Sequence, residues 1–332
     1  MRLSLAALGR SKGVRDTGAS APARGVYVTE SDLAGMRAAA RNFGFLKRQP
    51  VHSLLSGRHE SRVRGRGLAF EELRQYLPGD DVRTIDWRVT ARTGKPFVRV
   101  FTEEKDRPTL LVVDQRINMF FGSRRVMKSV TAAEVAALSA WRVLDQGDRV
   151  GGFVFDDDAV EEVRPNRSRD AVMRLIRAIV ARNAALRADT DAKRNPRQLD
   201  TVLDSVANVA HHDCLVIVVS DFDGHTARTR DLLMRLASRN DVMAGLVYDP
   251  FLLNLPKSGE IVVSDGELQI ELRLGQDKTH RNLSEFADAR AKEILAWQHE
   301  IGVPVLPLSA AEETAPQIRR LLGHVMQPAR RR

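Results

Sequence analysis

Two aspartates, Asp114 and Asp221, each end a short apolar run, and their types and positions could support chemistry. The runs, TLLVVD at 109–114 and CLVIVVSD at 214–221, are typical of buried parallel strands. Because ligands bind where the carboxyl ends of such strands meet, we expect both carboxylates at one edge of a sheet. Paired carboxylates could hold a divalent cation there. They could equally cap the following helices or accept turn amides, and the spacing alone favours this second interpretation.

Other chemistries lack their motifs in this chain. A dinucleotide site needs G-x-G-x-x-G between a strand and a helix, but the segment RGRGLAF lacks the third glycine and a preceding strand. Walker A and H-E-x-x-H sequences do not occur, and there is no G-x-S-x-G elbow between a predicted strand and a predicted helix. His211 and His212 are adjacent and would point about 100° apart on a helix, so they are poorly placed to chelate one metal ion. The single cysteine, Cys214, lies in an apolar run and is interpreted as a small buried side chain.

Strands and helices alternate along most of the chain, which predicts an α/β fold with a mainly parallel sheet and helices on both faces. The predicted strands are 109–114, 149–155, 160–163, 214–221, 242–249 and 303–308. The predicted helices are 124–145, 168–183, 199–211, 226–239, 282–299 and 311–322. A serine-aspartate-glycine turn between two alternating runs predicts a β-hairpin near 260–274.

The chain is expected to divide into two tails and two folded parts. A helix over about 31–46, with Ser31 or Asp32 as its cap, is placed together with a small β-rich subdomain. The predicted parts are a disordered tail at 1–27, the helix and subdomain at 28–105, the sheet domain at 106–325 and a basic tail at 326–332.

Composition favours a soluble, cytoplasmic protein. The 332 residues are 43% hydrophobic and 29% charged, and no run approaches the roughly 20 apolar residues of a membrane helix. No membrane partner is therefore expected. The net charge of +9 could attract nucleic acid, an anionic membrane surface or an acidic protein. Aromatic residues do not interleave the basic clusters at 58–66 and 330–332, so a solvated, arginine-rich surface is favoured over nucleic-acid binding.

The segment RGRGLAFEELRQYLPGDDVRTIDWRVTAR, at 64–92, is the most specific motif of the chain. It resembles the hallmark of the domain-of-unknown-function 58 family: glycine-x-glycine, a phenylalanine–glutamate pair, R-x-Y-x-P-G-D-D-x-R-x-I-D-W, then A-R. The resemblance continues through GDRVGGFVF and VVSDFDG and covers roughly 57–250.

The resemblance implies a von Willebrand factor A-like sheet domain, because members of the family resemble such domains. They are commonly encoded beside MoxR-type AAA+ ATPases. A non-enzymatic adaptor or chaperone-like partner of such an ATPase, acting in assembly or maturation of a protein complex, is therefore the expected function. The client protein is not named by the resemblance.

The metal site of von Willebrand A domains begins with D-x-S-x-S after the first strand, and this chain departs from that pattern. Asp114 is kept, but Arg116 and Asn118 replace the serines, while Asp221 matches the later aspartate. A cation at Arg116 would repel a metal by about 1 kcal/mol or more at short range. We therefore expect weak or absent Mg²⁺ binding and no resident cofactor. Arg116 is expected to pair with Asp114 or Asp221 in place of the ion.

The 74–92 part of the motif has its own physical interpretation. Pro78 and Gly79 suit a tight turn. Carboxylate–guanidinium pairs and an apolar anchor at Trp87 would form a buried network that fixes the subdomain onto the sheet. A partner-docking surface is the alternative, because arginine and tryptophan dominate interface hot spots. The residues concerned are Arg74, Tyr76, Pro78, Gly79, Asp80, Asp81, Arg83, Asp86, Trp87 and Arg92.

Two other functions stay open beside the adaptor. A metal-dependent phosphoester hydrolase would use Asp114 and Asp221 with further carboxylates. The available ones are Asp156, Asp157, Asp158 and Asp223. A basic nucleic-acid-binding protein would show a steep salt dependence of its affinity.

Overall fold

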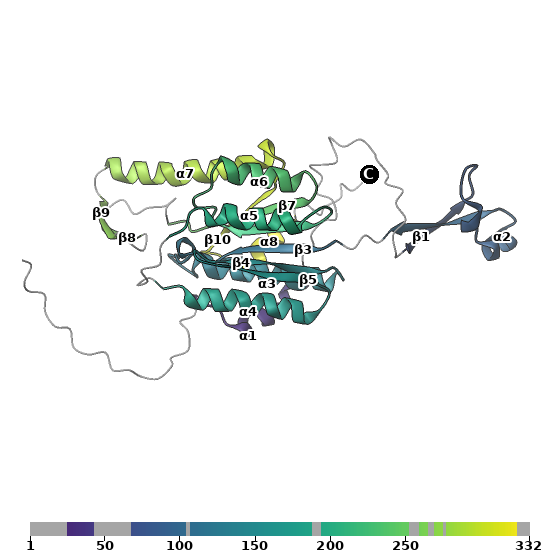
Figure 1. Cartoon of the computed structure of the whole chain (residues 1–332), viewed down its shortest axis with the longest axis horizontal. Helices are drawn as coiled ribbons and strands as arrows, with labels where there is room; N and C mark the ends of the chain where they lie inside the picture. The colour runs from purple at the N-terminus through teal and green to yellow at the C-terminus, as the bar shows by residue number, and fades with distance from the viewer. Residues whose placement is uncertain are drawn as a thin grey trace, which may run out of the picture.

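The computed structural model describes residues 25–42, 68–103, 107–187, 194–251, 259–264, 269–274 and 277–323 (Figure 1). The elements form a mixed α/β arrangement around one six-stranded sheet, as the alternation of strands and helices predicts. The basic tail predicted at 326–332 lies outside the described residues.

The sheet has the order β10-β7-β6-β3-β4-β5. All neighbouring strands run parallel except the edge strand β5, which is antiparallel to β4. The chain lays down β3, β4 and β5 towards one edge, then β6, β7 and β10 towards the other, so the order reverses between β3 and β6. The bounds are β3 Thr109–Asp114, β4 Val150–Phe155, β5 Val160–Asn166, β6 Leu215–Ser220, β7 Asp241–Tyr248 and β10 Val305–Ser309.

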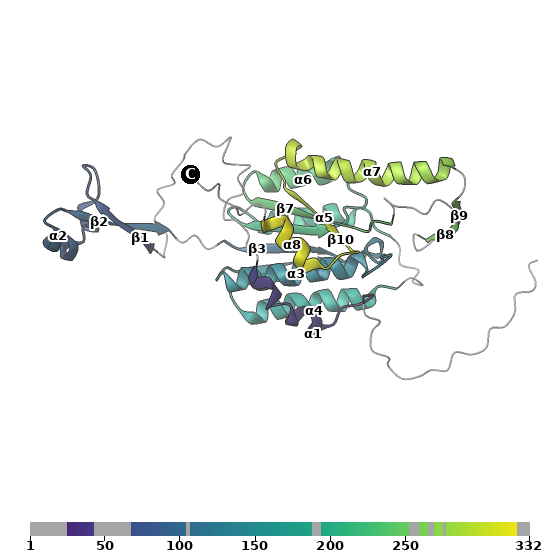
Figure 2. The ribbon, with the colours of Figure 1, turned by 180° about the vertical axis from the view of Figure 1, so that it is seen from behind.

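Helices cover both faces of this sheet, and each face has its own buried core (Figures 1 and 2). Side chains alternate along β3, so Leu111 and Val113 join one core while Leu110 and Val112 join the other. One core takes its helical residues from α1 Glu30–Gly35, α3 Lys128–Asp145, α4 Arg169–Ala185 and α8 Thr314–Gly323. The other takes them from α5 Gln198–Val209, α6 Ala227–Ala237 and α7 Asp277–Glu300.

The first helix is shorter than predicted and begins earlier. Thr29, rather than Ser31 or Asp32, caps α1: its hydroxyl accepts the Asp32 backbone N–H, and the Asp32 carboxylate accepts the Thr29 backbone N–H in a capping box. The helix ends at Gly35 and a 3-10 turn, η1 Ala39–Asn42, follows. The predicted end of this helix, beyond residue 42, lies outside the described residues.

The N-terminal boundary predictions need correction. Tyr27, placed in the disordered tail, donates a hydrogen bond from its hydroxyl to the Leu186 carbonyl at 2.8 Å. Leu33 is fully buried in the sheet domain, and the Trp141 indole donates to its carbonyl at 3.1 Å. The segment 28–42 therefore belongs to the sheet domain rather than to the subdomain, because its apolar side chains complete the core beside α3 and α4.

The subdomain itself is a two-stranded antiparallel ribbon with a short helix at its turn end (Figure 2). It consists of β1 Leu68–Gln75, η3 Val82–Thr84, α2 Trp87–Thr93 and β2 Phe97–Glu103. We call these elements, residues 68–103, the ribbon unit. Among the residues of the ribbon unit whose burial is described, Val98 is the one apolar side chain that is buried.

The predicted β-hairpin is confirmed as β8 Gly259–Ser264 paired with β9 Gln269–Leu274 in antiparallel register. It forms a sheet of its own and does not extend the six-stranded sheet. Among the described residues, no helix combines the length and the apolar character needed to cross a membrane.

Candidate functional site

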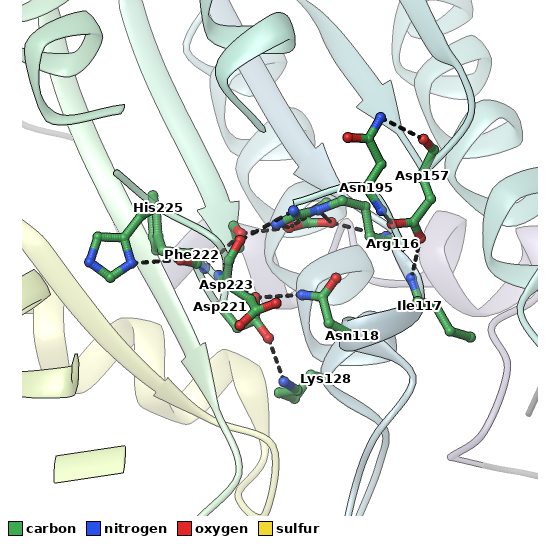
Figure 3. A network of polar contacts seen from close by, with 12 residues as sticks. Arg116, Ile117, Asn118, Lys128, Asp157, Asn195, Asp221, Phe222, Asp223 and His225 are labelled. Atoms are coloured by element: carbon green, nitrogen blue, oxygen red, sulfur yellow. Dashed lines mark hydrogen bonds and ion pairs between the residues drawn. The ribbon is translucent and has the colours of Figure 1, made fainter. Parts of the chain in front are cut away.

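The candidate site lies at the carboxyl edge of β3 and β6, where the strand order reverses (Figure 3). Such reversals are where open α/β sheets bind ligands. Asp114 is the last residue of β3, and Asp221 directly follows β6. The 3-10 turn η4 Ile117–Met119 carries Asn118 over the same edge. The structure therefore brings the sequence-predicted residues Asp114, Arg116, Asn118 and Asp221 together.

Arg116 and Asp114 form a bidentate ion pair that is almost wholly buried, with side-chain exposures of 1% and 0%. Arg116 Nη2 lies 2.7 Å from Asp114 Oδ2, and its Nε lies 3.1 Å from Oδ1. Ser220 Oγ also donates to Oδ2 at 2.6 Å. Burial lowers the pKa of Arg116, but the charge and hydrogen bonds of Asp114, together with the charges of Asp221 and Asp157, outweigh it and leave that pKa above its ordinary value. Both oxygens of Asp114 are thus occupied by this chain's own donors.

Asp221 is held in the same way by different residues. Lys128 Nζ lies 2.5 Å from its Oδ2, and Asn118 Nδ2 donates to its Oδ1 at 2.7 Å. Burial raises the pKa of Asp221, yet the charges of Lys128, Arg290 and Arg116 lower it to about 2. Asp221 is therefore ionised at neutral pH and fully engaged, which leaves it poorly suited to act as a base.

A third carboxylate, Asp223, links α7 to the site. Arg290, on α7, donates from Nη1 to Asp223 Oδ1 at 2.7 Å and from Nη2 to the Asp221 carbonyl at 2.8 Å. Arg194 pairs with the other oxygen of Asp223. Arg116 Nη1 reaches the Asp223 carbonyl at 3.2 Å. These contacts join the loop after β6 to a helix that begins more than fifty residues later.

Asp157, after β4, orders two loops at the rim of the site. Its carboxylate accepts from the backbone N–H of Ile117 at 2.7 Å and of Asn195 at 2.8 Å. Asp156 instead pairs with Arg182, and Asp158 is exposed. Of the further carboxylates that a hydrolase could use, only Asp157 and Asp223 reach this edge of the sheet in the described structure, and both hold loops in place.

The turn that carries Asp221 has an unusual backbone. Phe222 has φ 53°, in the left-handed region that few residues other than glycine adopt, and its side chain is fully buried. The ring meets Trp297 edge-to-face at 5.2 Å between centroids. Ser220 Oγ accepts the Phe222 N–H at 2.8 Å. The strained turn is thereby fixed, and Asp221 points at Asn118 and Lys128.

The site contains as many cations as carboxylates, four of each, so its formal charge is zero without a metal ion. The carboxylates are Asp114, Asp157, Asp221 and Asp223, and the cations are Arg116, Lys128, Arg194 and Arg290. Two like unit charges at about 4 Å repel by about 4 kcal/mol near a protein surface, so these cations oppose a divalent ion.

The residues do not fit the magnesium site that the von Willebrand A resemblance would imply. Both oxygens of Asp114 and of Asp221 accept hydrogen bonds from this chain. Asn118 Oδ1 is the one buried oxygen of the site without a partner among the described residues. One amide oxygen cannot supply the ligand set that Mg²⁺ requires. Over the described residues, no group of three or more histidine, cysteine or acidic side chains is arranged to hold a metal.

Sequence reasoning missed Lys128, Ser220, Arg194 and Arg290. Lys128 carries a signal that could have identified it, because it is the first residue of α3 and that first turn has no acidic residue. A cation at a helix N-terminus is disfavoured by the helix dipole, so its presence points to an anionic partner. Arg290 carries no such signal, because its contact with Asp223 depends on how α7 is placed on the sheet.

The PGDD motif lies in the ribbon unit and forms a turn as predicted. Asp80 N–H donates to the Leu77 carbonyl at 3.0 Å, and Gly79 has φ 104°, which a type II turn needs after a proline. Arg74 and Asp80 form a bidentate pair at 2.7 and 2.8 Å. The hydrogen bonds from Arg74 and from the Leu77 N–H hold the pKa of Asp80 below its ordinary value.

The rest of the motif differs from the buried network that we favoured. Asp81 and Asp86 serve as helix caps: Asp86 Oδ1 accepts from the backbone N–H of Arg88 and Val89 at 3.0 and 3.1 Å. Trp87 is 69% exposed rather than buried. The Tyr76 N–H joins the ribbon through the Pro96 carbonyl at 2.9 Å. A two-stranded ribbon has too little surface to cover a tryptophan, and this explains the exposure.

Comparison with solved structures gives distant likenesses. The conserved hypothetical protein BatB from Bacteroides thetaiotaomicron matches 66% of this chain and 98% of its own, with 12% identity and a TM-score of 0.37. The pilus adhesin SpaC from Lactobacillus rhamnosus GG matches 67% of this chain and 30% of its own, with 12% identity and a TM-score of 0.38. Both TM-scores are low, and these likenesses support no inference about fold or function.

Sequence comparison is more informative. Uncharacterized proteins of Mycobacterium tuberculosis and Mycobacterium bovis are each 28% identical to this chain over 292 residues, which is 87% of this chain and 89% of the relative. The model of the family described as "Protein of unknown function DUF58" matches residues 72–294. That match includes both the PGDD motif and the strand-end site. The chain belongs to the DUF58 family.

Proposed function

We propose that this protein is a non-enzymatic, cytoplasmic adaptor of a MoxR-type AAA+ ATPase, acting in assembly or maturation of a protein complex. One observation carries the non-enzymatic part: the two strand-end carboxylates are engaged by this chain's own donors. Asp114 pairs with Arg116, and Asp221 accepts hydrogen bonds from Lys128 and Asn118. Catalytic acids and bases need a free reactive atom and a matched pKa. A carboxylate with a pKa near 2 and both oxygens occupied provides neither.

The partner is proposed from the family resemblance, and the sheet domain is proposed to be von Willebrand factor A-like. A mainly parallel sheet with an antiparallel edge strand, and carboxylates paired at its carboxyl edge, agrees with that proposal. In place of a metal-bridged ligand site, the domain would present a rigid, charge-neutral edge. Such an edge suits an adaptor whose contacts depend on shape and polar groups rather than on metal.

Affinity capture tests the partner. The tagged full chain is incubated in native lysate with ATP, ADP or no nucleotide, and bound proteins are identified by mass spectrometry. We expect a MoxR-type AAA+ ATPase, with recovery that depends on the nucleotide. Arg174→Glu, at an exposed position of α4 away from the site, serves as the surface control. Failure to recover any AAA+ ATPase in all three nucleotide states would contradict the proposed partnership.

Turnover assays test the non-enzymatic part. The full chain is incubated with bis-p-nitrophenyl phosphate and Mg²⁺ or Mn²⁺, and we expect the rate to match the protein-free background. Hydrolysis above background that Asp221→Asn abolishes would instead support a metal-dependent phosphoester hydrolase. Asp158→Asn is the matched control, because Asp158 is an exposed carboxylate after β4.

A further inference from the structure

The ribbon unit carries most of the exposed large apolar side chains among the described residues. They are Leu73 at 38%, Leu77 at 60%, Val82 at 59% and Trp87 at 69%. In contrast, the sheet domain buries nearly all of its large apolar side chains in two cores. A concentration of exposed apolar side chains in one small unit is typical of interaction sites in soluble proteins.

Trp87 is the most exposed of these side chains. The other two tryptophans of the chain, Trp141 and Trp297, are each 1% exposed. Trp87 is the first residue of α2, where the Asp86 cap fixes the backbone. A rigidly mounted, exposed tryptophan loses little conformational entropy when it is covered, and tryptophan is enriched at the energetic centres of protein interfaces.

The charges on α2 identify the chemistry of what would cover it. Arg88 and Arg92 are spaced i, i+4, so they share one face of the helix, and both are exposed. No carboxylate of the described residues pairs with either. Like charges at this spacing destabilise a helix, a cost that a partner's carboxylates would remove. Arg83 and Lys95 add positive charge on the same unit without an ion pair in the described part of the chain.

We infer that α2, through its exposed Trp87, Arg88 and Arg92, docks a segment of a partner protein that is both acidic and apolar. Apolar side chains of that segment cover Trp87, and its carboxylates meet the two arginines. This inference deepens the proposed adaptor function, on which it rests. A second copy of this chain is a poor match for this surface, because two chains that each carry a net charge of +9 repel each other. Nucleic acid is disfavoured because Trp87 stands alone and offers no series of stacking platforms.

Site-specific photo-crosslinking tests the inference in the full chain. Exposed Ala91, on α2 between the arginines, is replaced by benzoylphenylalanine, the protein is irradiated in native lysate, and crosslinked peptides are sequenced. We expect partner peptides that are rich in aspartate and glutamate and that also contain large apolar residues. Arg88→Glu with Arg92→Glu should reduce these crosslinks about tenfold or more, because like charges across an interface are strongly unfavourable.

Three variants control the measurement. Arg88→Lys with Arg92→Lys keeps the charge and should retain most of the crosslinks. Arg174→Glu with Arg319→Glu reverses two exposed arginines on α4 and α8 and should leave them unchanged. Trp87→Ala should reduce them while the arginines stay in place. Circular dichroism and a thermal melt of each variant exclude loss of folding as the cause.

The outcomes separate the docking surface from the adaptor function. Crosslinks to nucleic acid, to this chain itself, or to partner peptides without acidic residues overturn the docking inference, as do no crosslinks or crosslinks that charge reversal leaves unchanged. Capture of the AAA+ ATPase by the same samples is scored independently. If the ATPase is captured but the crosslinks give any result that overturns the docking inference, the proposed docking surface on α2 is wrong and the adaptor function stands. If capture also fails, the adaptor proposal fails with it.

Discussion

The candidate site at the sheet edge and the ribbon unit differ in whether their charged side chains have partners within the chain. At the sheet edge, every carboxylate meets a cation or a backbone amide, and the Arg116–Asp114 pair is almost fully buried. On α2, Arg88 and Arg92 face solvent beside an exposed tryptophan. The first region is complete within the chain, whereas the second is complete only with something from outside. The difference indicates that the sheet edge stabilises the fold and that the ribbon unit makes contacts.

The largest expected effect comes from breaking the buried pair. Arg116→Ala leaves Asp114 charged and buried, so we expect the free energy of unfolding to fall by about 3–5 kcal/mol in urea titrations. Arg116→Met with Asp114→Asn removes both charges and should recover much of that loss. Arg88→Ala, the control from the ribbon unit, should change stability by about 0.5 kcal/mol or less. An Arg116→Ala protein as stable as the wild type would contradict the assignment of a structural role to the sheet edge.

The second effect is a pH dependence. The pKa of Asp221 is lowered from 3.8 to about 2, so its ionisation stabilises the folded state above pH 3.8 and that contribution is lost as the pH falls towards 2. The shift corresponds to a contribution on the order of 2 kcal/mol. Lys128→Met removes the strongest of the lowering charges, so the acid unfolding midpoint should move to higher pH.

The control for this pH dependence is Lys95→Met in the ribbon unit, which removes an exposed lysine and should leave the acid midpoint unchanged. Unfolding is followed by circular dichroism from pH 1.5 to pH 6. Equal midpoints for Lys128→Met and the wild type would show that Lys128 does not hold Asp221 ionised.

A smaller effect is expected in the ribbon unit. Trp87→Ala removes a side chain that is 69% exposed, so the unfolding free energy should change by about 0.5 kcal/mol or less. Trp141→Ala, in the core beside α3, is the contrast and should cost about 3–5 kcal/mol. A large loss of unfolding free energy for Trp87→Ala would mean that this side chain is covered within the chain. The contrast between a self-contained sheet edge and an exposed ribbon unit would then be wrong.

The smallest expected effect is the response to metal. A ligand that binds only the folded state raises the unfolding temperature, and saturating ligand adds several kcal/mol. Because the site is charge-neutral and its carboxylate oxygens are occupied, we expect no shift of Tm with millimolar Mg²⁺ or with EDTA. Arg116→Ser removes one opposing cation and should show a larger magnesium response than the wild type. A wild-type Tm that rises with Mg²⁺ and returns with EDTA would refute this view of the site.

Much of the sheet could be predicted from the sequence because its strands are short apolar runs bounded by helices. Asp114 and Asp221 could be placed at one edge for the same reason, since parallel strands end together. The partners Lys128 and Arg290 could not, because they reach the site from helices whose rotation and packing no local pattern specifies. The charge of Arg116 was enough to expect its pairing, whereas the burial of the pair required the whole fold.

Predictions failed where a local rule competed with tertiary contacts. Apolar character predicted a buried Trp87, but a two-stranded ribbon offers no second layer to cover it. Residues 28–42 were assigned to the subdomain by their position in the chain, yet Leu33 and Ala40 complete the sheet domain's core. Sequence proximity is a poor guide when the segment in between, here 43–67, is long enough to let two neighbours fold apart.

The three tryptophans give the molecule a built-in set of spectroscopic reporters. Trp141 lies in the core on the α3 side of the sheet, Trp297 lies in the core on the α7 side, and Trp87 lies on the ribbon unit. Proteins that keep one tryptophan each would emit from three separate environments, two shielded from aqueous quenchers and one open to them. Their fluorescence would therefore follow the two faces of the sheet and the ribbon separately, and would show whether these three parts lose their structure together.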